Sequence, residues 1–170
     1  MSIYEDVVPP MTQALTNLER WLDLAVEHAE ARKFDPAVFL TARLAPDQYP
    51  LVRQIQAACD QAKAAAARLA GQEPPKHPDT ETTLDEVRAR INTVKTFLAG
   101  FTPADFETAA TRVVPLPFMQ GQGMLAADYV RQMALPNFYF HLVHAYAILR
   151  HNGVPLGKVP FIGSLNLRPL

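Results

Sequence analysis

Apolar residues recur at alternating intervals of three and four along three long stretches of this chain. An α-helix turns once every 3.6 residues, so this spacing places the apolar side chains of each stretch on one face. Helices with one apolar face bury it against each other, which predicts an all-α helical bundle. The three series are Val8, Met11, Leu15, Leu18 and Leu22; Val52, Ile55, Cys59, Ala62, Ala66 and Leu69; and Leu84, Val87, Ile91, Val94 and Leu98.

The ends of these three helices can be placed from capping residues and prolines. The first helix is expected over residues 10–32, and the second from residues 46–49 to residue 69 or 70. Thr83 and Glu86 have the spacing of a capping box, in which each side chain bonds the other's backbone, so the third helix should begin about there.

The second half of the chain mixes helical and irregular patterns. Residues 111–124 combine β-branched residues with prolines and glycines, which favours a short irregular hairpin or a long crossover. A last helical region is expected over residues 125–151, kinked or split at Pro136 because proline lacks the backbone donor. Residues 153–170 should form an extended tail that lies over the bundle or reaches a second subunit. We expect one domain over residues 1–170.

Composition excludes several classes of function. Sixteen basic and 17 acidic residues give a net charge of −1, and no basic cluster stands out that would bind nucleic acid or an anionic membrane. No apolar run approaches the roughly 20 residues that span a bilayer. Cys59 is the one cysteine, so no internal disulfide can form. We therefore expect a cytoplasmic protein that binds neither nucleic acid nor membrane.

The fourth helical region carries the most informative polar residues. His141 follows Phe138 on an apolar line, and Asn137 and His144 lie on an adjacent line at helical spacing. Two interpretations of His141 stay open: a ligand or base inside the bundle core, or a buried histidine that bonds a neighbour and fixes packing. Gln54, on the second helix, could supply a third ligand or an amide partner for His141, or could simply be solvated.

Two stretches of the chain also resemble a known family. NFYFHLVHAYAILRHNGVPLGK and LAPDQYPLVRQIQAACDQAKAAAARL are similar to an uncharacterised bacterial family of unknown function within the DinB/YfiT-like superfamily. The resemblance covers essentially the whole chain. It implies an up-down-down-up four-helix bundle, frequent dimers, and in many members a divalent metal held by three histidines. Some members use that metal for thiol-dependent transferase or isomerase chemistry.

The resemblance also assigns positions in this chain. His141 matches the second histidine of a His-x3-His pair, Asn137 replaces the first, and Gln54 matches the ligand on the second helix. Because amide oxygens are weak zinc ligands, the implied metal site of His141, Asn137 and Gln54 is expected to be degenerate. We expect no resident cofactor, with Zn²⁺ or Ni²⁺ as the alternative.

These observations give three hypotheses. In the leading one, a homodimeric bundle binds an unidentified small molecule in a pocket of Gln54, Asn137, His141 and His144, and no catalytic residue is assigned. The second is a divalent-metal-dependent hydrolase or thiol transferase with His141 as the main ligand. The third is a structural or partner-binding dimer that uses its C-terminal tail. Whether the protein is an enzyme stays open.

Overall fold

The structure is a computed structural model and describes residues 2–116 and 118–169. Residue 117, in the predicted irregular segment, and residue 170, at the end of the predicted tail, lie outside the described residues. The described chain is mostly helical with one small sheet, which confirms the all-α prediction. Its α-helices are α1 (Ile3–Arg32), α2 (Val38–Thr41), α3 (Leu51–Leu69), α4 (Leu84–Ala99), α5 (Ala126–Asp128), α6 (Leu135–His151) and α7 (Lys158–Ile162).

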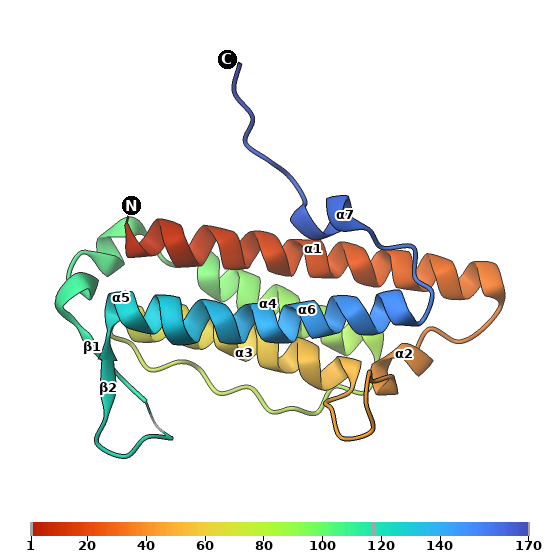
Figure 1. The fold of residues 1–170 in the computed structure, drawn as a ribbon, viewed down its shortest axis with the longest axis horizontal. Helices are drawn as coiled ribbons and strands as arrows, with labels where there is room; N and C mark the ends of the chain where they lie inside the picture. Colours follow the sequence, from red (N-terminus) through yellow and green to blue (C-terminus); the bar gives the residue numbers. More distant parts are fainter. Residues whose placement is uncertain (1, 117, 170) are drawn as a thin grey trace.

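The four long helices α1, α3, α4 and α6 lie alongside each other and enclose the core (Figure 1). Most residues of the predicted apolar series are buried, including Leu15, Ile55 and Val94, while Val52 and Leu84 are half-buried against the same core. Alanines supply much of the buried face of α3, and their small side chains let neighbouring helices approach closely. Within the described ranges, no helix is both long and apolar enough to cross a membrane.

Helix α1 begins at Ile3, seven residues before the predicted start at Pro10, so that boundary was wrong. The side chain of Ser2 accepts a hydrogen bond from the backbone of Glu5 and caps the helix. Pro9 and Pro10 therefore lie inside the helix, although each lacks one backbone donor. Burial of apolar side chains in the same turns, Val7 and Val8 among them, offsets that loss.

Two long connectors join the helices. Residues 72–83, which we name the strap, connect the end of α3 to the start of α4. The strap runs back along the length of the helices (Figure 1). The strap ends at the capping box of Thr83 and Glu86, which is present as predicted. In the irregular segment, β1 (Val113–Pro115) pairs antiparallel with β2 (Gly123–Leu125), so the expected short hairpin is found. Single turns η1 (Pro103–Phe106) and η2 (Ala109–Thr111) precede it.

The fourth helical region is not split at Pro136: it runs without a break from residue 126 to residue 151 and changes helix type just before the proline. The π-helix η3 (Tyr129–Ala134) joins α5 to α6, and Pro136 falls in the first turn of α6, where a missing backbone donor costs little. The tail differs from the extended segment predicted, because α7 is helical. Its Phe161 ring stacks on Trp21 of α1 with centroids 5.5 Å apart, and burial of these rings stabilises the helical turn.

Candidate functional site

The site is centred on a hydrogen bond between α3 and α6. Gln54 is 2% exposed, and its Oε1 lies 2.8 Å from Nδ1 of His141. The Nε2 of Gln54 donates to the carbonyl of Tyr49 at 3.4 Å, which turns Oε1 toward the imidazole. Because Oε1 can only accept, Nδ1 of His141 carries the proton and Nε2 keeps its lone pair.

Aromatic rings border the imidazole of His141 on two sides. The Tyr49 ring is nearly parallel to it, at 13° with centroids 6.5 Å apart, and the Phe140 ring stands edge-on at 5.2 Å. Burial lowers the pKa of His141 below its ordinary value of 6.5, and the nearby His144 and Arg53 lower it further. The imidazole is therefore neutral at pH 7 and can accept a hydrogen bond, take up a proton or bind a metal through Nε2.

His144 lies one turn further along α6 and has partners at both ring nitrogens. Its Nδ1 donates to the carbonyl of Phe140 at 2.6 Å, and its Nε2 lies 3.3 Å from the side-chain nitrogen of Gln48. That amide nitrogen can only donate, so Nε2 of His144 accepts. Among the described residues, none bonds Nε2 of His141, whereas Nε2 of His144 is bonded to Gln48.

The structure joins two of the predicted site residues directly and leaves the others beside them. Gln54 and His141 bond each other, whereas the half-buried Asn137 makes no side-chain hydrogen bond to either of them within the described residues. The described part of the chain contains no group of three or more His, Cys, Asp or Glu side chains placed to hold a metal ion. The metal set of His141, Asn137 and Gln54 stays a prediction.

Cys59 does not provide a nucleophile near this site. Its side chain is fully buried, and burial raises the pKa of the thiol to about 12. The thiolate is the reactive form, so the group is inert at neutral pH.

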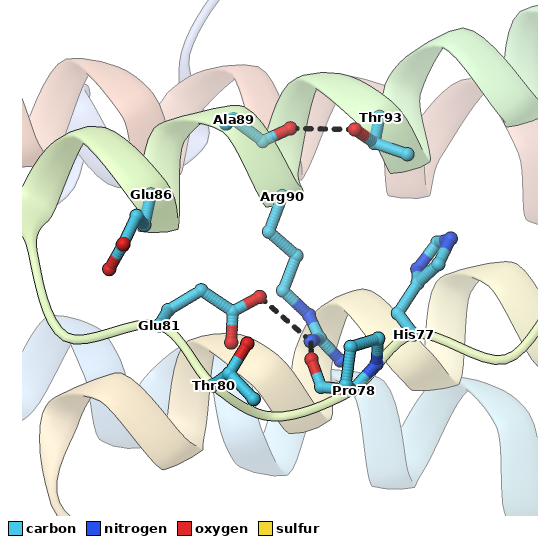
Figure 2. Close-up of a pocket in the computed structure, with 8 residues that line it drawn as sticks. All are labelled: His77, Pro78, Thr80, Glu81, Glu86, Ala89, Arg90 and Thr93. Atoms are coloured by element: carbon cyan, nitrogen blue, oxygen red, sulfur yellow. Dashed lines mark hydrogen bonds and ion pairs between the residues drawn. The ribbon is translucent and has the colours of Figure 1, made fainter.

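A second polar cluster, centred on Arg90 of α4, was not found from the sequence. The side chain of Arg90 is 3% exposed and forms an ion pair with Asp60 of α3 at 2.9 Å. It forms two more ion pairs with the strap, to Asp79 at 3.0 Å and to Glu81 at 2.9 Å. The guanidinium also donates to the carbonyl of Pro78 at 3.0 Å, and it points from α4 toward the strap (Figure 2). These contacts fix the strap to α3 and α4.

This cluster borders a hollow of about 310 Å³ between the strap and α4, with His77 and Thr93 on its walls. The carboxylates around Arg90 are committed to ion pairs, which indicates a structural role. A single arginine within an otherwise apolar helix face gives no sequence signal for its partners, because they lie 9 to 30 residues away.

The family model described as "Domain of unknown function (DUF1993)" matches residues 3–162. The chain belongs to this family. Among solved structures, it is similar to the crystal structure of a DinB family member protein from Shewanella denitrificans, determined at 1.83 Å resolution. The two are 45% identical with a TM-score of 0.94, and the likeness covers 98% of this chain and 95% of that chain. A comparison with curated proteins finds no match.

The resemblance stated from the sequence is confirmed by both matches. This DUF1993 chain is a DinB-like helical protein, and the match over residues 3–162 includes Gln54, Asn137, His141 and His144. Tyr49, Gln48 and Phe140 were missing from the predicted site. Tyr49 and Gln48 fall in the quoted stretch before α3, but nothing in the spacing indicates that this connector folds against α6.

Proposed function

We propose that this DUF1993 chain binds a small molecule at the surface around His141, between α3 and α6. The observation that carries the proposal is the 2.8 Å bond from Nδ1 of His141 to Oε1 of Gln54. A buried amide holds the imidazole in one tautomer and one orientation, which leaves Nε2 as a positioned acceptor. Such positioning of a polar group in an apolar surround is typical of ligand sites.

The neighbouring side chains define the chemistry of the ligand. Tyr49 is exposed, and Phe140 is 54% exposed, so both rings offer apolar faces beside the imidazole. A ligand that fits has a flat apolar part to pack on these rings and one N–H or O–H group to donate to Nε2 of His141. Asn137 and His144 flank the site on α6: Asn137 would bind a further polar group of the ligand, whereas His144, whose ring nitrogens are both bonded, would offer its ring as a packing surface.

The fold that holds this site is, in our proposal, the up-down-down-up four-helix bundle that the resemblance implies. The strap supports this topology, because it returns along the helices and lets α4 run in the same direction as α3 (Figure 1). The pairing of α3 with α6 is what places Gln54 against His141. Two of the three degenerate metal positions, Gln54 and His141, would then serve as a hydrogen-bonded pair that fixes one imidazole.

Nuclear magnetic resonance of the histidine side chains tests this proposal. A panel of phenols and indoles, each with one donor and a flat ring, is titrated while the Nε2 signal of His141 is followed. We expect at least one member to shift that signal and to lose binding in His141→Phe, which retains a ring but no acceptor. His151→Phe, at the exposed end of α6, is the matched control. Binding that His141→Phe leaves unchanged would contradict the proposal.

A divalent-metal protein is the second candidate, favoured by the same lone pair at Nε2 of His141, which no described residue bonds. Zinc would take this one imidazole, with solvent completing its shell, and could support hydrolase or thiol-transferase chemistry. Metal analysis of protein purified without a nickel column separates the candidates. Near-stoichiometric zinc or nickel that is lost in His141→Ala supports the metal protein. A melting temperature that neither added Zn²⁺ nor a chelator changes supports the metal-free site.

A further inference from the structure

Residues 164–169, which we name the arm, follow α7 and point away from the helices (Figure 1). Two large apolar residues dominate the arm: Leu165 is 62% exposed and Leu167 is 83% exposed. Residues two apart fall on the same side of an extended segment. The arm can therefore present both leucines to one surface, and this much exposed apolar area on a short segment indicates a binding partner.

A groove of suitable character lies between the first turns of α1 and the stretch from α5 to α6. Its volume is about 610 Å³. An adjoining hollow of about 230 Å³ shares Pro10 and Tyr139 with it and continues along α1 to Phe161 of α7. The apolar lining of the groove consists of Ile3, Pro10, Ala110, Ala127, Val130 and Leu135.

The charges of the arm and the groove are complementary. Glu5 and Asp6 line the groove, and neither forms an ion pair within the described residues. Arg168 of the arm is exposed and is likewise unpaired there. Arg131 also lines the groove and would repel Arg168. An arm bound there must therefore place Arg168 toward Glu5 and Asp6, which fixes its direction.

The position of α7 decides whether the arm can bind the groove of its own chain or that of a second copy. Side-chain nitrogens of Trp21 and Asn17 donate to backbone carbonyls of α7 at 2.9 to 3.2 Å and hold it against the middle of α1. Gly163 then turns the chain with a φ of +76°, and the arm leaves its own helices. A second copy offers the same groove, and a two-fold axis lets both arms bind at once.

We propose that two copies of this chain exchange their arms, each placing Leu165 and Leu167 in the other's groove and Arg168 against its Glu5 and Asp6. The fixed position of α7 lowers the cost of ordering the arm, because only six residues lose freedom on binding. This inference does not depend on the ligand site at His141.

Sedimentation of the 170-residue chain over a range of concentrations tests the exchange. We expect a dimer that Leu165→Asp combined with Leu167→Asp weakens at least about tenfold, or roughly 1.4 kcal/mol, and that removal of residues after Gly163 abolishes. Val38→Asp, at an exposed apolar position on α2, is the matched control and leaves the dimer unchanged. A chain that is monomeric at every concentration, or a dimer that persists without the arm, overturns the proposal.

Charge reversal identifies the contact itself. Arg168→Glu should weaken the dimer, and so should Glu5→Lys with Asp6→Lys, while the combination of all three should recover part of the loss. Circular dichroism verifies that each variant is folded. Failure of the combined variant to recover any affinity, with all variants folded, overturns the assigned contact. A monomer whose arm amides are protected from hydrogen exchange would instead show that the arm closes on its own groove, which also overturns the exchange.

Discussion

The amide of Gln54 decides which nitrogen of His141 carries the proton and which keeps its lone pair. A buried amide without partners would cost about 1–3 kcal/mol, and here the carbonyl of Tyr49 and the imidazole satisfy it from two sides. The bond does for His141 what an outer partner does for a metal-bound histidine: it sets the tautomer and the orientation. Gln54 therefore acts as a positioning residue rather than as a direct contact of the ligand.

Burial of the His141 ring has a direct consequence for its protonation. Its pKa should lie below 6.5, because burial penalises the imidazolium. Gln54→Glu should raise that pKa, since a carboxylate beside Nδ1 stabilises the charged ring. A pH titration followed by nuclear magnetic resonance measures both values. Gln61→Glu, further along α3, should leave the pKa of His141 nearly unchanged. A wild-type value at or above 6.5 would show that burial does not control this group.

The same shift predicts the sign of a pH effect on stability. The unfolded chain takes up a proton on His141 near pH 6.5, whereas the folded chain does so only at lower pH. The contribution of His141 to the free energy of unfolding is therefore fully present above pH 6.5. This contribution is lost as the pH falls from 6.5 to the pKa of His141 in the folded chain. Below that pKa, the protonation of His141 changes the free energy of unfolding no further.

Part of this site could be predicted from sequence because helical spacing is a local property. The spacing placed His141 on a core-facing line, and the resemblance singled out Gln54 as its partner across the core. The roles of Tyr49 and Gln48 could not be predicted, because they depend on how the connector before α3 folds against α6. Asn137 shares the helix face of His141, but a shared face does not ensure a shared hydrogen bond.

At the scale of elements, α4 owes its start to the capping box. Thr83 accepts from the backbone of Glu86 at 3.2 Å, and the Glu86 carboxylate accepts from the backbone of Thr83 at 3.0 Å. Thr83→Ala should lower the free energy of unfolding by about 1 kcal/mol, as measured by urea denaturation. Thr93→Ala, at an exposed position of the same helix, should change it by less than about 0.5 kcal/mol. Equal losses from the two variants would argue against the cap.

The strap depends on Arg90 for its attachment to α3 and α4. Arg90→Met keeps most of the volume but leaves Glu81 and Asp79 without their buried cation, so we expect a loss of about 2–4 kcal/mol in the free energy of unfolding. Limited trypsin digestion should then cut the strap faster. Arg88→Met, which removes the more exposed pair with Asp23, should cost less than about 1 kcal/mol. A strap as resistant in Arg90→Met as in the wild type would refute this attachment.

The helices were predictable where their signals are local, and less so where tertiary packing competes. The capping box and the three apolar series needed no knowledge of neighbouring helices. The start of α1 was misplaced because Pro9 and Pro10 look like a boundary, whereas Ser2 and buried apolar residues extend the helix past them. The π-helix before α6 has no sequence signature of its own, because it arises where the turn ahead of Pro136 must adjust to packing on α3.

At the scale of the whole molecule, the tail is tied to the first helix. Trp21 of α1 is fully buried although it lies on the outer side of the helices, because Phe161 and Tyr146 cover its ring at centroid distances of 5.5 and 5.4 Å. Its indole nitrogen donates to the carbonyl of Pro160 at 2.9 Å. Helix α7 therefore completes the core beside α1 and fixes the point from which the arm departs.

Trp21 is the one tryptophan in the chain, so its fluorescence reports whether α7 is docked. Phe161→Ala removes the stacked ring, which should expose the indole, shift its emission to longer wavelength and lower the free energy of unfolding by about 2 kcal/mol. Val159→Ala, at an exposed position of α7, should change neither quantity appreciably. An unshifted emission in Phe161→Ala would mean that the hydrogen bonds of Trp21 and Asn17 hold α7 without the stacked ring. The further variant Asn17→Ala in that background would then be expected to release the helix and shift the emission.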